Sequence, residues 1–295
     1  MQFLDRIARL PKLGIGVSTE YGAGDTPNAL DPIALRAEHP QFARFLEVGI
    51  ETAKGLDRHA RAWAGRNLPA TYHFLDVNLD EPEDLDDAWL DAVRGFAAEI
   101  RPAWMCGDAG LWHFGKRERG HMLLLPPVLT GDAASALAEG ICTLRDATGF
   151  EVFPENPPGQ VFVGDLHVLD FFARVCERAD TGMLLDCAHL GIAQRMTGHE
   201  PLDGLDGFPC ERIVEMHVAG GTVHERDGFA FVEDDHHTGV LPPTWMIFEH
   251  AVTRARNLRA VVFECERNAS ERCLPGFERI AATLSRGGHE ALVPS

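Results

Sequence analysis

Carboxylates and imidazoles recur along the chain at positions where they could hold metal ions together. Six of them stand at or near the end of a short apolar run: His73, Asp108, Glu155, Asp186, His217 and Glu264. Two close spacings extend the set, Asp186-Cys187-Ala188-His189 and Asp234-Asp235-His236, the latter with alternate residues that share one side of an extended segment. So many acids and histidines in one place would cost several kcal/mol in repulsion and lost hydration without cations among them. The pattern therefore predicts a metal site.

The ligand set consists of nitrogen and oxygen atoms, which suits zinc, iron or manganese and does not choose between them. Glu155 could bridge neighbouring ions through its two carboxylate oxygens. Glu215 lies two residues before His217 on the same strand. Glu266 lies two residues after Glu264. Because residues two apart share one side of a strand, Glu215 and Glu266 are expected to be additional ligands or partners that orient the imidazoles. With more than one ion, both hydrolysis by a bridging water and activation of dioxygen by ferrous iron are open.

The elements that must position these residues are eight short apolar runs with strand character. They are Leu13–Ser18, Arg44–Val48, Ala70–Phe74, Ala103–Cys106, Glu151–Pro154, Gly182–Leu185, Arg212–Val218 and Arg259–Phe263. Helical patterns lie between them, at Glu51–Trp63, Leu85–Ile100, Ala133–Thr148, Leu166–Arg178, Leu190–Met196, Thr244–Arg256 and Gly276–Ser285. This alternation predicts an α/β fold, and eight such units fit a closed (β/α)8 TIM barrel. The strand ends, with the candidate ligands, would then share one face.

We expect a single domain over residues 1–295, with the barrel over 13–286 and a loose tail over 287–295. Two long stretches, Gly107–Gly131 and Ala219–Pro243, are expected to be irregular and to lie on the face where barrel enzymes place their chemistry. No G-x-G-x-x-G pattern follows the first predicted strand, which excludes a Rossmann fold.

Composition narrows the classes of partner. The chain has 27 Lys and Arg against 45 Asp and Glu, a net charge of −18 at pH 7, which argues against nucleic acid as a partner. No run approaches the roughly 18 apolar residues of a membrane span and no signal-peptide pattern is present, so we expect no membrane association and a cytoplasmic location. Seven scattered cysteines without a C-x-x-C pair indicate reduced, mostly buried thiols.

The order of the candidate ligands resembles that of the metal ligands in the xylose isomerase-like barrels. The endonuclease IV branch of that superfamily has the same D-x-x-H and D-x-H pieces. The flanking sequences are most similar to the multinuclear non-heme iron-dependent oxidases (MNIO, DUF692). These sequences are Gly14-Ile15-Gly16-Val17, Phe45-Leu46-Glu47-Val48, Glu155-Asn156-Pro157, Leu184-Leu185-Asp186 and Glu215-Met216-His217-Val218-Ala219-Gly220, and the resemblance runs from Leu13 to Asn268.

The resemblance implies a barrel that holds two or three iron ions (Fe2+/Fe3+), with zinc or manganese as alternatives. Such enzymes use dioxygen to oxidise a residue, often cysteine, of a ribosomally made peptide that a leader-peptide recognition partner protein brings. A small thiol or amino acid is an alternative substrate. Transferred to the matching positions of this chain, the resemblance implies three iron sites. The first would be held by His73 and Glu155, and the second by Glu155 with Asp186, His217 and Glu264. The third would be held by His189, Asp234 and His236.

The chain departs from this family pattern after the fourth predicted strand. Relatives have a carboxylate followed by a histidine where this chain has Asp108-Ala109, so Asp108 or His113 is expected to fill the gap, or the centre holds only two ions. Glu155, Asp108 and His113 are the catalytic candidates. The loop Trp112–Arg119, which includes Lys116 and Arg117, is either a docking patch for an anionic substrate or acidic leader peptide, or a solvated loop.

Three other functions remain open at this point. The D-x-x-H and D-x-H pieces also fit a zinc-dependent phosphodiesterase of the endonuclease IV type, which the negative charge opposes. A sugar isomerase or epimerase would use one divalent ion and a glutamate or lysine for proton transfer, and the number of nitrogen ligands exceeds that need. A barrel that has lost an ion and serves as a binding scaffold is the non-catalytic alternative.

Overall fold

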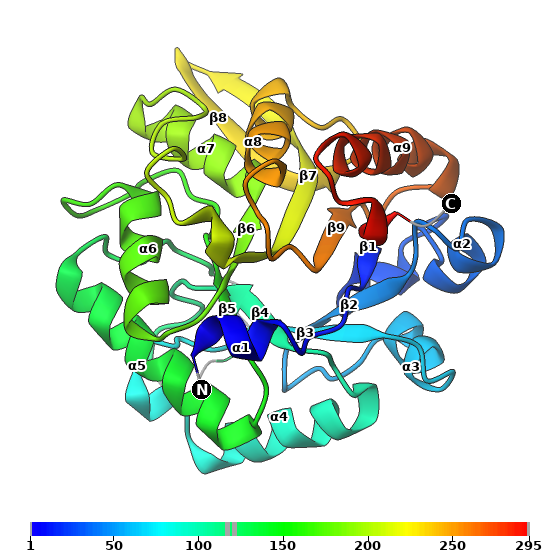
Figure 1. The fold of residues 1–295 in the computed structure, drawn as a ribbon, viewed down its shortest axis with the longest axis horizontal. Helices are drawn as coiled ribbons and strands as arrows, with labels where there is room; N and C mark the ends of the chain where they lie inside the picture. Colours follow the sequence, from blue (N-terminus) through cyan, green and yellow to red (C-terminus); the bar gives the residue numbers. More distant parts are fainter. Residues whose placement is uncertain (1, 116–118, 120–122, 294–295) are drawn as a thin grey trace.

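Each of the eight predicted strands forms a strand of one closed barrel (Figure 1) in the computed structural model, which describes residues 2–115, 119 and 123–293. The barrel strands are β1 (Gly14–Thr19), β2 (Phe45–Ile50), β3 (Ala70–Phe74), β4 (Met105–Asp108), β5 (Val152–Glu155), β6 (Met183–Asp186), β7 (Ile213–Arg226) and β9 (Ala260–Glu264). Neighbours pair in parallel in the order β6-β5-β4-β3-β2-β1-β9-β7. A further pairing of β7 with β6 closes the ring. The predicted (β/α)8 barrel is therefore confirmed.

Helices follow the strands and surround the barrel. They are α2 (Pro32–Glu38), α3 (Arg58–Ala64), α4 (Asp87–Ile100), α5 (Gly131–Thr148), α6 (Val168–Arg178), α7 (Cys187–Thr197), α8 (Pro242–Val252) and α9 (Ser270–Arg286). Short 3-10 turns lie at η1 (Ala23–Asp25), η2 (Pro82–Asp84), η3 (Cys210–Arg212) and η4 (Glu290–Leu292). The predicted helix Glu51–Trp63 begins only at Arg58, because Asp57 accepts a hydrogen bond from the Ala60 amide and caps the helix there.

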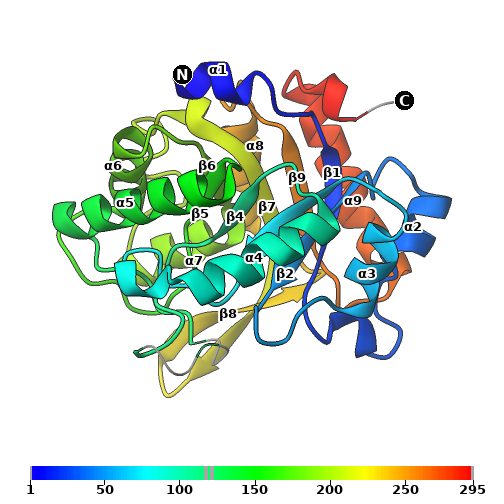
Figure 2. The ribbon, with the colours of Figure 1, turned by 90° about the horizontal axis from the view of Figure 1, so that it is seen from below.

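A short helix, α1 (Phe3–Ile7), covers the amino-terminal end of the barrel, at the opposite end of the molecule from β8 (Figure 2). Its Phe3 and Ile7 pack with Phe45, Trp104 and other residues that fill the barrel interior at this end. Apolar side chains thus close one end of the barrel, and polar side chains gather at the other. Among the described residues, no helix is long and apolar enough to cross a membrane.

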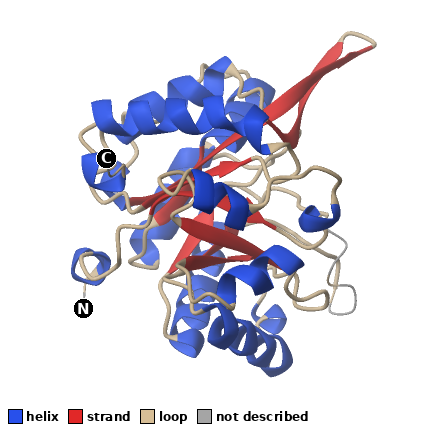
Figure 3. Ribbon diagram, turned by 90° about the vertical axis from the view of Figure 1, so that its right-hand side faces the viewer, coloured by secondary structure: helices blue, strands red, loops and turns tan. Residues whose placement is uncertain are grey.

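The stretch Ala219–Pro243, expected to be irregular, contains a long hairpin. Strand β7 continues out of the barrel to Arg226 and returns as the antiparallel strand β8 (Phe229–His237), which projects beyond the helices (Figure 3). Asp227 and Gly228 form the turn with φ of 53° and 81°, the conformation that two-residue hairpin turns require. The Asp-Gly pair is the signal that could have predicted this hairpin.

The end of the chain is not the loose tail that the sequence suggested, at least as far as Val293. Leu292 is 1% exposed and belongs to the main hydrophobic core. Its carbonyl accepts a hydrogen bond from the Arg44 guanidinium at 3.1 Å. These contacts fix the segment after α9 against the barrel.

Candidate metal centre

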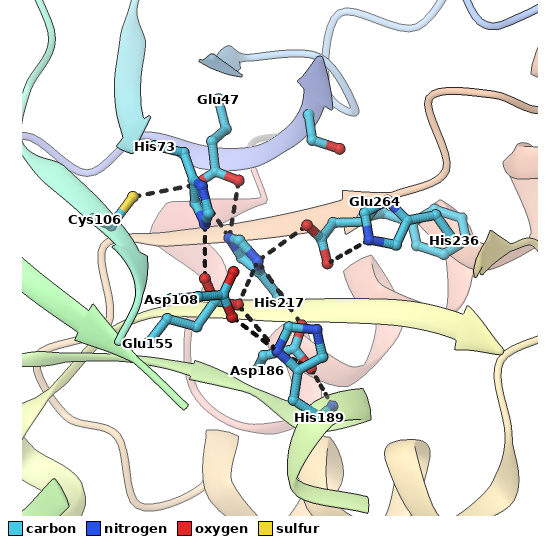
Figure 4. Close-up of polar contacts among 12 residues, drawn as sticks. Glu47, His73, Cys106, Asp108, Glu155, Asp186, His189, His217, His236 and Glu264 are labelled. Carbon is cyan, nitrogen blue, oxygen red and sulfur yellow. Dashed lines mark hydrogen bonds and ion pairs between the residues drawn. The ribbon is translucent and has the colours of Figure 1, made fainter. Parts of the chain in front are cut away.

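The carboxyl ends of the barrel strands bring six of the candidate ligands into one buried cluster (Figure 4). Strands β3, β4, β5, β6, β7 and β9 contribute His73, Asp108, Glu155, Asp186, His217 and Glu264, in that order. Helix α7 contributes His189, and strand β8 of the hairpin contributes Asp234 and His236. All nine residues predicted as metal ligands therefore lie together.

Glu155 lies at the centre of the cluster and is 1% exposed. Its Oε2 lies 2.7 Å from Nε2 of His73. Its Oε1 lies 3.3 Å from Nδ1 of His217 and 3.5 Å from Nδ1 of His189. One carboxylate thus contacts three imidazoles from three different elements, which is the geometry expected of a bridging ligand.

The D-x-x-H spacing is explained by a helix cap. Asp186 ends β6 and caps α7, because its Oδ1 accepts a hydrogen bond from the His189 amide at 2.5 Å. This places His189 in the first turn of α7, over the end of the barrel. The Asn156 side chain holds the same corner, since it donates to the Asp186 carbonyl and accepts from the Asp186 amide.

Three imidazoles each have one ring nitrogen held by an outer partner and the other facing the cluster. Nε2 of His217 lies 3.1 Å from Glu47, and its Nδ1 lies 3.3 Å from Glu264. Nδ1 of His189 lies 2.9 Å from the Asn156 carbonyl. A carbonyl only accepts hydrogen bonds, so Nδ1 of His189 carries a proton, and Nε2 of this ring faces Asp234 at 2.9 Å.

The third imidazole of this kind belongs to the hairpin. Nδ1 of His236 lies 2.8 Å from Glu266, which in turn accepts a hydrogen bond from Ser18. Nε2 of His236 faces Asp234 at 3.7 Å and Glu264 at 3.8 Å. Glu266 thus has the orienting position that its spacing from Glu264 suggested.

Several buried ligand atoms have no hydrogen-bond partner. They include Oδ1 of Asp108, Oδ2 of Asp186, Nδ1 of His217, Oδ1 of Asp234 and Oε2 of Glu264. Buried polar atoms are seldom left unpaired, because each costs about 1–3 kcal/mol. Close groups of possible ligands also overlap here, such as His73 with Asp108 and Glu155, and Glu155 with Asp186 and His189. The residues present therefore fit bound metal ions.

The charge balance within the cluster points to the same conclusion. Burial raises the pKa of Asp108 well above its usual range and that of Asp186 to about 7. Burial opposes the charged forms of Glu155 and His217 as well. Their mutual attraction nevertheless lowers the pKa of Glu155, while the carboxylates around His217 raise its pKa. Without cations, then, the cluster keeps protons on some acids, and metal ions would displace them.

His113 is not part of this cluster. Its Nε2 lies 2.9 Å from Asp84 and its Nδ1 lies 2.7 Å from the Gly115 carbonyl. Arg119 of the same loop is also turned inward, where it forms an ion pair with Asp84. These contacts hold His113 and Arg119 against the barrel, and Lys116 and Arg117 of the predicted docking patch lie outside the described residues.

Ala109, which stands where the resemblance implied a histidine, is 2% exposed and packs in the hydrophobic core.

Sequence reasoning missed Glu47, which is 1% exposed on β2. Besides His217, its carboxylate contacts the Cys106 thiol at 3.3 Å. Glu215 lies close to both, and its Oε2 accepts a hydrogen bond from the Trp104 indole at 2.6 Å. In the sequence, Glu47 does not form a recognisable metal-binding motif with another acid, histidine or cysteine. Only its position inside an apolar run could have indicated a buried carboxylate.

A cavity of about 470 Å³ opens over the cluster. Its walls include His73, Asp108, Glu155 and Trp112. Among the described lining residues, Arg267 is the only lysine or arginine, and it forms an ion pair with Glu20 at the mouth. A small molecule or one residue of a peptide fits a space of this size.

Fold and site together define a (β/α)8 barrel with a buried cluster suited to metal ions. Residues 21–284 match the family model described as RiPP precursor modification enzyme MbnB/TglH/ChrH. This match spans most of the chain, so the protein belongs to that family, the MNIO (DUF692/UPF0276) enzymes. The family resemblance inferred from the sequence is thereby confirmed, and the family is one of metal-dependent enzymes that modify RiPP precursors.

Curated relatives carry the name UPF0276 protein. The chain is 25% identical to the one from Rhizorhabdus wittichii over 232 residues, which covers 78% of each chain. It is 29% identical to the one from Acaryochloris marina over 190 residues, which covers 63% of this chain and 66% of the relative.

Solved structures share the fold. A xylose isomerase-like TIM barrel protein from Mycobacterium smegmatis, in complex with magnesium, superposes with a TM-score of 0.58 at 12% identity and covers 95% of this chain and 98% of its own. A Thermus thermophilus protein soaked with ZnCl2 gives a TM-score of 0.55 at 18% identity, with 91% and 98% covered. At these identities the likeness shows the fold alone.

Proposed function

We propose that this protein is a multinuclear non-heme iron oxidase that uses dioxygen to modify a peptide residue, with cysteine as the residue of choice. The observation that carries the proposal is the central carboxylate of Glu155, shared among His73, His189 and His217 in a buried site. Membership of a family that modifies RiPP precursors supports a peptide as substrate. A small thiol or amino acid is the alternative substrate.

Overlapping sets of residues would hold the ions. His73, Asp108 and Glu155 form one set. His217 lies beside the other oxygen of Glu155 and forms a second set with Asp186 and Glu264. His189 forms a third set with Asp234 and His236 of the hairpin. The nitrogen and oxygen donors suit iron, with zinc or manganese as alternatives. When bound, ferrous iron supplies the electrons with which dioxygen is activated.

The protein's own side chains orient the ligands and handle protons. Glu47, the Asn156 carbonyl and Glu266 fix the three imidazoles, so that the inward nitrogens need no reorganisation on metal binding. Asp108 lines the cavity and has one oxygen without a hydrogen-bond partner. We assign to it, once bound ions have displaced its own proton, the acceptance of the thiol proton of the substrate. His113 has no part in this proposal, because both its nitrogens are used by Asp84 and Gly115.

The proposal is tested by metal content and by dependence on dioxygen. Protein purified without added metal is analysed for its elements, and we expect two or three iron ions per chain. The ferrous-loaded protein is then incubated with cysteine-containing peptides, together with a leader-peptide recognition protein, in air and under argon. We expect a mass change on cysteine only in air.

Equal product without dioxygen would contradict the proposal. Stoichiometric zinc, together with cleavage of abasic DNA, would instead favour the phosphodiesterase alternative. If the purified protein binds no metal, the non-catalytic alternative, a binding scaffold, would be favoured.

A further inference from the structure

A second cavity, of about 500 Å³, lies beside the metal cavity under the β7–β8 hairpin. Its walls are formed by α7, β7, β8 and the start of α8, which lie side by side at the top of Figure 1. Asp234 lines both this cavity and the one over the cluster. A ligand in the second cavity would therefore lie next to the proposed metal centre.

The inner surface of this cavity is apolar. Ile192 of α7 and Val232 of β8 are 4% and 3% exposed, and Val223 stands at the rim with 42% exposed. Gly220 and Gly221 leave the adjacent part of the β7 wall without side chains. A Cβ on Gly220 would lie 1.8 Å from the His237 carbonyl oxygen, so the close hairpin crossing requires glycine at this position. The space that remains suits one apolar side chain of a ligand.

One cation stands at the edge of this apolar surface. Arg195 is exposed near the end of α7, and among the described residues that line the cavity it is the only lysine or arginine. Within the described part of the chain no ion pair involves it, although the protein carries 45 acidic residues. Asp234, the acid in this cavity, is already engaged by His189 and His236. A carboxylate of a ligand is therefore the complementary group.

We propose that this cavity binds a segment of the substrate peptide in which an apolar residue stands next to an acidic one. The apolar side chain enters the space between Ile192 and Val232, and the carboxylate pairs with Arg195. The proposal rests on the proposed function for the statement that the substrate is a peptide. It places a recognition site a short distance from the residue that is modified.

The test measures binding of dipeptide probes by NMR. The full chain, loaded with diamagnetic Zn2+ and labelled with 13C on its Ile, Leu and Val methyl groups, is titrated with acetyl-Leu-Glu-amide, acetyl-Leu-Lys-amide and acetyl-Ser-Glu-amide. We expect acetyl-Leu-Glu-amide to shift the methyl signals of Ile192, Val223 and Val232 saturably, and those of Leu4 not at all, because Leu4 is exposed on α1 at the opposite end of the molecule from β8 (Figure 2). Its affinity should exceed that of each other probe about three- to fivefold.

Two variants separate the charge from the cavity. Arg195→Ala should abolish the preference for Glu over Lys, whereas Arg226→Ala, which removes the same charge from the exposed hairpin turn, should keep it. The absence of saturable shifts in the three methyl groups would overturn the proposal. So would equal affinities for the Leu-Glu and Leu-Lys probes. The zinc content of each sample is measured separately, so failure of the metal centre is distinguished from failure of this site.

Discussion

The carboxylate of Glu155 occupies a position that no other residue of the cluster can fill. It contacts imidazoles from β3, α7 and β7, and the remaining acids of the cluster lie around these contacts. A neutral amide of the same shape would keep a hydrogen bond to His73 but would lose the charge and one acceptor oxygen. The geometry therefore predicts a defect in metal binding rather than in folding.

We expect Glu155→Gln to weaken metal binding by at least about tenfold and to leave the circular dichroism spectrum unchanged. Metal content after dialysis against a fixed free-metal concentration is the measurement. Glu233→Gln is the matched control, because Glu233 is an exposed carboxylate of β8 that contacts only His224, at 2.8 Å, among the imidazoles. Full metal stoichiometry in Glu155→Gln would show that the bridging position is elsewhere.

Residue types and spacings were sufficient to identify the residues that gather at the barrel mouth, but not their partners. The D-x-x-H pair follows from a helix cap, a local rule that is readable in sequence. Glu47 and Asn156 act through contacts with residues 170 and 33 positions away. Contacts of this kind depend on barrel register, which no short spacing encodes. His113 was misplaced for the converse reason, since Asp84 and Gly115 take up both its nitrogens.

At the scale of elements, the barrel strands were readable because each is a short apolar run buried on both faces. Their boundaries moved by a residue or two, apart from the end of β7, which was predicted at Val218 and lies at Arg226. The hairpin was not readable from hydrophobicity, because its outer part alternates exposed and half-buried residues and carries many charges. Yet the hairpin places Asp234 and His236 in the cluster, so the contribution of this element to the candidate metal site depends on its geometry more than on its composition.

Gly220 is the point at which this element can be tested. A Cβ there would lie 1.8 Å from the His237 carbonyl oxygen, so Gly220→Ala must push β8 away from β7. We expect the shift to cost about 1–3 kcal/mol of unfolding free energy and to lower the metal content, because Asp234 and His236 move with β8. Chemical denaturation and elemental analysis measure the two effects.

Gly95→Ala in α4 is the control for this substitution. Its Cβ would meet open space, and alanine favours a helix over glycine by roughly 0.5–1 kcal/mol. This variant should therefore keep its metal and gain slightly in stability. A Gly220→Ala protein with wild-type metal content would show that the hairpin does not position the third set of ligands.

For the whole molecule, the excess of acid has two components. Part of the net charge of −18 comes from exposed and half-buried side chains, where water and salt screen it. The carboxylates inside the barrel mouth are different, because burial keeps Asp108 and Asp186 from ionising together with their neighbours. The folded chain therefore holds a buried acidic arrangement whose charge bound cations would balance.

Metal binding and folding stability should consequently be coupled. Ions bind the assembled cluster and not the unfolded chain, where its members are far apart in sequence, so at a free-metal concentration about 1,000 times Kd they add about 4 kcal/mol of stability. For a chain of this length we expect the Tm to rise on the order of 5–10 °C between chelated and ferrous-loaded protein. Differential scanning calorimetry under argon measures the shift, and Glu155→Gln should show a much smaller one. An equal shift in both proteins would locate the stabilising ions outside the barrel mouth.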